Sequence, residues 1–129
     1  MMWISELENP DAIQSIFDEE PSLASVRLMK VELLEEGPTV NVSLALRDYP
    51  CRPPLRWSRI KANAARLDLQ LPGVSQVTIN GWSTDNVVDC TIERSAANEI
   101  AVSLRNSKMA FQAICVGIRV SQIKGYQRR

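Results

Sequence analysis

Three cysteines, Cys51, Cys90 and Cys115, are the candidate nucleophiles of this sequence. Three arginines lie within five residues of Cys51, and positive charge beside a thiol can lower its pKa and activate it. No residue that could act as a base for Cys51 or orient it can be recognised, so we expect no catalysis there. Cys90 and Cys115 fall in the apolar phase of strand-like segments and are expected to pack in the core.

The absence of histidine excludes several kinds of active site. Ser-His-Asp and Cys-His catalysis, the usual proton shuttle at neutral pH and most zinc sites all require it. The sequence also lacks the common glycine-rich phosphate-binding motifs and any carboxylate spacing typical of calcium sites. A carboxylate pair for glycoside cleavage stays open, because fifteen acidic residues form many pairs whose separation the sequence does not report. We therefore expect no enzymatic activity, no cofactor and no metal.

Cysteine usage and hydropathy indicate a reducing compartment. The three cysteines cannot all pair within one chain, and none has the Cys-x-x-Cys spacing. The first twenty residues contain no lysine or arginine and no apolar run of signal-peptide length, and no 18-residue apolar stretch occurs anywhere. These features predict a cytoplasmic protein with free thiols and no membrane partner. The sequence does not indicate an oligomeric state.

Charge is zero in total but uneven along the chain. Residues 1–50 carry ten acids and three bases, a net charge of −7, whereas residues 51–129 carry twelve bases and five acids, a net charge of +7. If the two halves mix in one core, much of this charge becomes local pairing across strands. Alternatively, the runs that contain Glu19, Glu20, Glu35 and Glu36 form an acidic face that attracts a basic partner protein. The basic residues are scattered, so we expect no nucleic-acid partner.

Length and composition predict a single domain over residues 1–129, with 45% hydrophobic and 23% charged residues. One short N-terminal helix is expected, with Asn9 as its N-cap, Pro10 at its first position and Pro21 as its end. Its apolar residues share one face at spacings of three and four: Ile13, Ile16 and Phe17.

Most of the remaining sequence alternates with a period of two, which is typical of strands with one wet face. The clearest runs lie at residues 40–46, 65–71, 88–92 and 100–104. Residues 23–34 have a mixed apolar phase that indicates a bulge or a strand buried on both faces. Residues 109–123 change phase near Ala113, which indicates a kink or a bulge. Hairpin turns are expected at residues 36–38, 71–73, 95–98 and 105–108. The sequence thus predicts a mainly β fold of seven or eight antiparallel strands in a sandwich or a strongly curved sheet.

Two aromatic residues stand in unusual settings. Residues 48–57, DYPCRPPLRW, contain three prolines that cannot donate to a sheet ladder; we expect them to hold the chain extended until Trp57 enters the core. Trp82 follows a strand end and precedes a polar loop. A large ring there could anchor an interface, although a place in the core or at its rim is also open.

Several of these features, in this order, resemble a family of bacterial immunity proteins, the one catalogued as immunity protein family fifty, from polymorphic toxin systems. The matching features span nearly the whole chain: an N-terminal Trp and short helix, Pro21-Ser22-Leu23 leading into Val26-Arg27-Leu28, Gly37-Pro38 before an alternating strand, Pro53-Pro54-Leu55-Arg56-Trp57, Asn63 with the 67–71 strand, Ile79-Asn80-Gly81-Trp82, Phe111, and a closing 118–123 strand with Gly125-Tyr126.

The resemblance implies an antidote that binds a cognate toxin domain in the cytoplasm and blocks its active site or its access to substrate. The family pattern offers no catalytic motif and does not identify the toxin. Among the residues of this chain, we expect Glu19, Glu20, Glu35, Glu36 and Trp82 to contact the partner. Two other functions remain open: a non-catalytic β-sandwich interaction module unrelated to toxins, and a carrier of an apolar ligand.

Overall fold

A computed structural model describes residues 3–128 of the 129-residue chain. Its elements follow in chain order: the 3-10 helix η1 (Trp3–Glu6), α1 (Asp11–Gln14), β1 (Val26–Leu34), β2 (Thr39–Ala45), α2 (Leu55–Arg59), β3 (Ala64–Leu71), β4 (Gln76–Asn80), β5 (Val87–Ala96), β6 (Glu99–Arg105), β7 (Ala110–Cys115) and β8 (Arg119–Tyr126).

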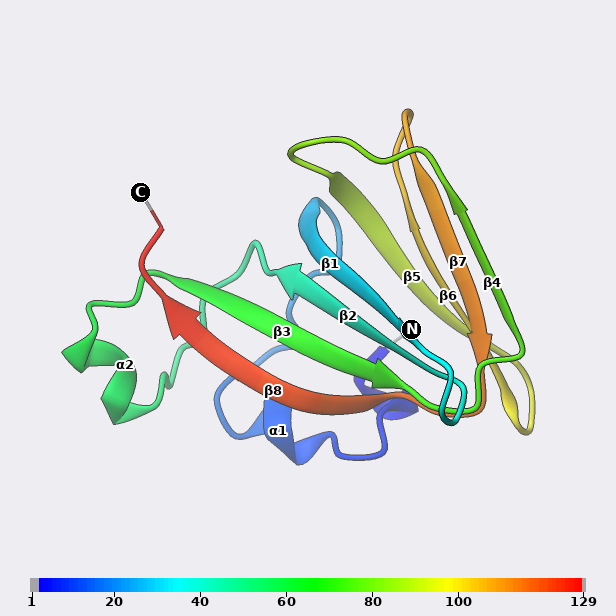
Figure 1. Ribbon diagram of the computed structural model, residues 1–129. Coiled ribbons are helices and arrows are strands. Elements are labelled where there is room, and N and C mark those ends of the chain that lie inside the picture. The colour runs from blue at the N-terminus through cyan, green and yellow to red at the C-terminus, as the bar shows by residue number, and fades with distance from the viewer. Residues whose placement is uncertain (1–2, 129) are drawn as a thin grey trace.

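All eight strands belong to one open antiparallel sheet in the order β4-β7-β6-β5-β1-β2-β3-β8, which confirms the mainly β prediction and its strand number. The central junction is weak, because β1 and β5 share only two residue pairs, Val26 with Val88 and Arg27 with Val87. Figure 1 shows that the sheet bends at this junction, so that its two four-stranded halves stand at an angle to each other. The strongly curved alternative is therefore the correct one.

Alternating side chains from both halves fill one core. In β3 the pattern is regular, with Leu67, Leu69 and Leu71 buried and the residues between them partly exposed. The same alternation buries Val102 and Leu104 in β6. These residues form a single hydrophobic cluster with the apolar residues of the N-terminal segment, as burial of one face of each strand requires.

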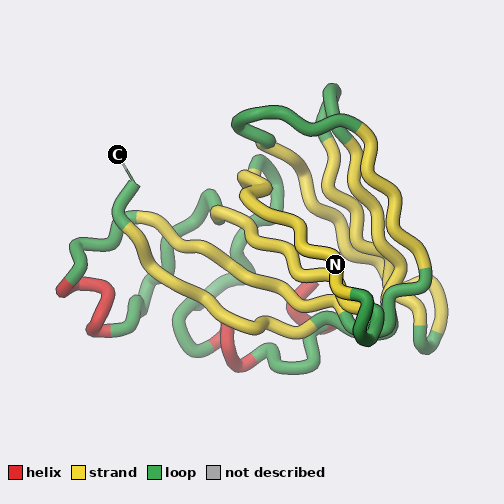
Figure 2. Tube along the Cα trace, in the orientation of Figure 1, coloured by secondary structure: helices red, strands yellow, loops and turns green. Residues whose placement is uncertain are grey.

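The N-terminal segment is fastened to both halves of the sheet. The side-chain amide of Asn9 donates to the Val120 carbonyl at 2.8 Å and accepts from the Val120 amide at 2.8 Å. On the other half, Arg94 of β5 donates to Glu6 at 2.9 Å. Figure 2 shows the helices and loops of this segment lying against the strands.

The predicted helix caps are wrong. Asn9 does not cap α1, because its side chain is used by β8; Pro10 precedes the helix instead, without a side-chain cap. The helix also ends at Gln14 rather than at Pro21. Val120 lies on the edge strand β8, next to β3, and both its N–H and its C=O bond to the Asn9 side chain. In the helical turn, the amides of Ala12 and Ile13 bond to the backbone carbonyls of Asn9 and Pro10 instead.

The proline-rich segment ends in a second short helix, α2, where an extended chain was expected. Pro54 keeps an extended conformation, and the helix begins at the next residue. Trp57 enters the core as predicted, with 2% of its surface exposed. A Cβ at Gly125 of β8 would collide with the Trp57 ring, so glycine permits this packing.

Two connections differ from the expectation. Residues 71–73 do not form a hairpin: β3 pairs with β2 and β8, whereas β4 pairs with β7, so the turn carries the chain between the halves. Residues 109–123 form two strands, β7 and β8, rather than one kinked strand. The hairpin turns near residues 36–38, 95–98 and 105–108 are confirmed, as is the irregularity in β1, a register shift between Leu28 and Lys30.

The Asn9 contact predicts a stability effect. Asn9→Ala removes both hydrogen bonds to Val120, and we expect the free energy of unfolding to fall by about 1–3 kcal/mol, measured by urea denaturation. Asn98→Ala, in an exposed turn, is the matched control and should stay within about 0.5 kcal/mol of the unchanged protein. Equal effects of the two substitutions would contradict this role of Asn9.

Candidate functional site

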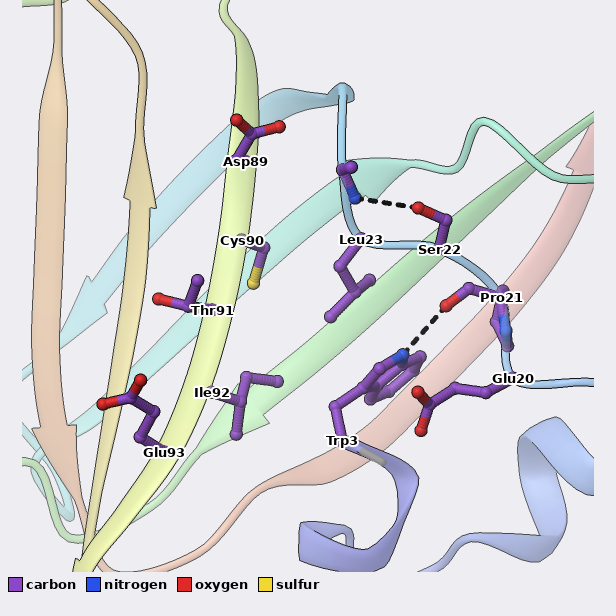
Figure 3. A pocket seen from close by; sticks show the side chains of 11 residues that line it. Trp3, Glu20, Pro21, Ser22, Leu23, Asp89, Cys90, Thr91, Ile92 and Glu93 are labelled. Atoms are coloured by element: carbon purple, nitrogen blue, oxygen red, sulfur yellow. Dashed lines mark hydrogen bonds between the residues drawn. The ribbon is translucent and has the colours of Figure 1, made fainter. Parts of the chain in front are cut away.

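An open groove of about 550 Å³ lies between β5 and the segment that precedes β1 (Figure 3). Three parts of the chain line it: Trp3 of η1, residues 20–24, and residues 89–93 of β5. These parts are far apart in sequence, so the groove is a product of the tertiary fold.

Hydrogen bonds fix the wall opposite β5. The indole Nε1–H of Trp3 donates to the Pro21 carbonyl at 2.9 Å, and the Ile4 amide donates to the Glu20 carboxylate at 3.0 Å. The amide of Cys90 in β5 donates to the Leu23 carbonyl at 2.9 Å. Residues 20–24 are therefore held between η1 and β5.

The alternation of β5 gives the groove two kinds of surface. Cys90 and Ile92 are buried and point toward Leu23 and Trp3 in Figure 3. Thr91 and Glu93 are exposed and point to the other side of the strand. The groove thus combines an apolar floor with a polar rim.

The one thiol among the described residues that line the groove is a poor nucleophile. Burial raises the pKa of the Cys90 thiol to about 12, so this thiol is neutral at physiological pH and a poor nucleophile. Within residues 3–128, no group of three or more His, Cys, Asp or Glu side chains is arranged to hold a metal ion.

An acidic cavity of about 330 Å³ adjoins the groove, because Glu20 lines both. Residues 17–20 and residues 48, 49 and 51 form its walls, and four of them are acidic: Asp18, Glu19, Glu20 and Asp48. Asp48 was not among the residues expected to contact a partner. It is 28 residues from Glu20 in the sequence, so no local pattern could have indicated it.

Contacts between distant segments build this cavity. The Ser22 amide donates to the Asp48 carboxylate at 2.8 Å, and the Asp18 amide donates to the Cys51 sulfur at 3.2 Å. Arg52 forms an ion pair with Asp18. The hydrogen bond that the Arg52 guanidinium donates to the Asp18 carboxylate is the main reason why the pKa of this carboxyl is lowered. The proline-rich segment therefore helps to shape an acidic surface, while Cys51 lies exposed.

The other candidate residues lie elsewhere. Glu35 and Glu36 are exposed in the β1–β2 turn, which precedes β2, whereas Asp48 follows β2. The seven residues of β2 separate the turn from Asp48 by roughly 23 Å. Trp82 is 54% exposed and follows the C-terminal end of β4. The other end of β4 lies near the β1–β2 turn, because the Val74 amide, just before β4, donates to the Pro38 carbonyl in that turn. Trp82 is therefore at the end of β4 that is away from Glu35 and Glu36. The structure thus joins Glu19 and Glu20 in one surface and places the other three residues in two separate ones.

Pairing between the acidic and basic parts of the sequence is limited. Four ion pairs occur within residues 3–128, and three of them join residues 1–50 to residues 51–129: Arg27–Asp85, Arg52–Asp18 and Arg94–Glu6. Glu19, Glu35 and Glu36 take part in none of them. Both interpretations of the uneven charge are therefore partly realised.

A family model, described as Immunity protein 50, matches residues 9–126. The chain belongs to the immunity protein 50 family. Membership supports an immunity protein role, which implies a toxin as binding partner. The matched range includes both groove walls formed by residues 20–24 and 89–93, whereas Trp3 precedes it. No curated protein and no solved structure matches the sequence.

None of the helices within residues 3–128 is long and apolar enough to cross a membrane.

Burial predicts which thiol of this family member reacts. We expect Ellman's reagent to modify one cysteine in the folded protein and all three in denaturant, because Cys51 is exposed whereas Cys90 and Cys115 are buried with pKa values raised to about 12 and about 11. Cys51→Ser should abolish the reaction of the folded protein. Rapid modification of a second thiol in the folded state would show that the core is more open than the structure has it.

Proposed function

We propose that this protein neutralises a cognate bacterial toxin domain in the cytoplasm, by binding the toxin and covering its active site or its access to substrate. The observation that carries the proposal is the family match over residues 9–126. The match favours this function over an unrelated interaction module and over an apolar-ligand carrier.

Surface features support inhibition by binding. A standard inhibitory interface buries on the order of 1,600 Å² in total and requires complementary shape and charge rather than a reaction. The groove beside β5 and the acidic cavity adjoin at Glu20, and together they offer apolar and acidic groups to a partner.

The proposed contacts divide between three places. Glu19 and Glu20, together with Asp48, supply the acidic field of the cavity, because Asp18 is paired with Arg52. This field would accelerate association with a basic toxin surface. Glu35 and Glu36 would supply a second, separate acidic field at the β1–β2 turn. Trp82 is the aromatic side chain best placed to anchor a contact, because more than half of its surface is exposed.

Co-expression tests the function directly. The toxin domain encoded by a neighbouring gene should arrest growth when expressed alone, and co-expression of this protein should restore growth. An unrelated β protein of similar size, expressed at the same level, serves as the control. The proposed function fails if a toxic neighbouring domain still arrests growth in the presence of this protein and the two purified proteins do not bind each other.

Charge reversal tests the electrostatic contribution. Replacing Glu19, Glu20, Glu35 and Glu36 by Lys should slow association with the toxin by on the order of tenfold at low salt, and the difference should shrink as salt is added, because exposed charges are screened. Stopped-flow fluorescence measures the association rate.

Glu19→Lys alone is the necessary companion variant, because the Glu20 carboxylate also accepts the Ile4 amide and its loss could disturb the fold. Glu99→Lys, a charge reversal at the β5–β6 turn, changes the net charge as much as Glu19→Lys does and is its matched control. If the fourfold variant associates as fast as the Glu99 variant at every salt concentration, the acidic residues do not steer the toxin.

A further inference from the structure

Within residues 3–128, the edge of β5 that faces the groove is free beyond Cys90. β1 pairs only with Val87 and Val88, and the next bond on this edge runs from the Cys90 amide to Leu23. In an antiparallel strand, alternate residues direct their N–H and C=O groups to the same side. The backbone groups of Ile92 therefore point into the groove, away from β6, and they have no hydrogen-bond partner within residues 3–128.

This edge continues a sheet, so its unpaired backbone groups are suited to an added strand. Residues 91–93 of β5 follow the bond from Cys90 to Leu23 and line the groove, a length that would match about three residues of extended chain, roughly 10 Å. An added strand would project its side chains alternately to the two sides of β5. One side holds Cys90, Ile92 and the Trp3 ring, and the other holds Thr91 and Glu93.

The charges around the groove indicate the sequence of that strand. Its eleven lining residues include three acids, Glu20, Asp89 and Glu93, and no base. Asp89 accepts the Ser25 amide at 2.9 Å. Arg105, directly opposite Asp89 on β6, donates its Nε–H to Ser103 at 3.1 Å instead of forming an ion pair with Asp89.

We propose that the groove binds an extended segment of the partner protein by strand addition to β5, with apolar and basic side chains alternating along the segment. The apolar side chains pack on Ile92 and Trp3, and the basic ones lie beside Asp89 and Glu93. The partner's backbone completes the hydrogen bonds of Ile92. The inference rests on the proposed function in one respect, namely that this partner is the toxin.

Hydrogen exchange of single amides, followed by NMR, tests the proposal in the full-length protein. In the free protein the Ile92 amide should exchange faster than the amides of Thr91 and Glu93, which face β6. In the toxin complex its exchange should slow by about tenfold or more, the effect of one added hydrogen bond in a protected site. An Ile92 amide that is already protected in the free protein, or whose exchange is unchanged in the complex, would overturn the proposal.

Glu93→Lys provides a matched substitution. Glu93 is exposed and has no ion pair within residues 3–128, so the variant should fold normally while its affinity for the toxin falls by about tenfold. Glu99→Lys, the same charge change at the far end of the β5–β6 hairpin, should leave the affinity within about twofold. Equal affinities of the two variants would contradict the placement of basic side chains beside Glu93.

A peptide probe separates failure of the groove from failure of the proposed function. If the toxin binds but Ile92 stays unprotected, the groove proposal fails and the immunity function stands. If no toxin binds, a synthetic peptide of alternating lysine and valine is added to the protein instead. Shifts of the amide NMR signals of residues 89–93 with this peptide, but not with a peptide of alternating glutamate and valine, would support the groove as a binding site. The absence of these shifts with the lysine peptide would refute it.

Discussion

The two-pair junction between β1 and β5 is the constraint on which the rest of the structure depends. Eight strands with long pairings throughout would form a broad twisted sheet, and burying one face of it would require a second layer. Here the ladder is interrupted after Val26 and Arg27, so the sheet can bend and its own halves can share a core. The hydrophobic cluster that includes residues from both halves is the consequence.

The same interruption creates the candidate binding surface. Because β1 leaves β5 after Val88, the next part of the β5 edge would be exposed to solvent if residues 20–24 did not approach it. These residues make one backbone bond to it, from Cys90 to Leu23, and they leave the backbone groups of Ile92 open. The N-terminal segment thus completes the core and also forms one wall of the groove. Stability and the proposed recognition therefore depend on the same contacts, among them the Trp3 bond to Pro21 and the Glu20 bond to Ile4.

Local sequence patterns predicted the strands where burial of one face decides the structure. The 65–71 run alternates and is buried on alternate residues in β3, because a half-buried strand requires a period of two. Turn chemistry was less informative. Pro72 and Gly73 favour a turn, and Gly73 adopts the positive φ of +60° expected of it, but the same turn can begin a hairpin or a crossing between two halves of a sheet. Asn9 is ambiguous for a similar reason, because its amide can cap a helix or bind a neighbouring strand, and only the position of Val120 decided between them.

The sequence by itself determined the fold class, the burial of Cys90 and Cys115, the entry of Trp57 into the core and, through the order of its motifs, the family. These properties depend on residue type and on short-range periodicity, which are present in any stretch of the chain. Tertiary structure alone decided which strand edges stay open and which acids gather. Asp48 joins Glu19 and Glu20 across 28 or more residues, whereas Glu36, closer to Glu20 in sequence, lies beyond the other end of β2. Strand pairing is non-local, and the free edge of β5 exists because of where β1 stops pairing with it.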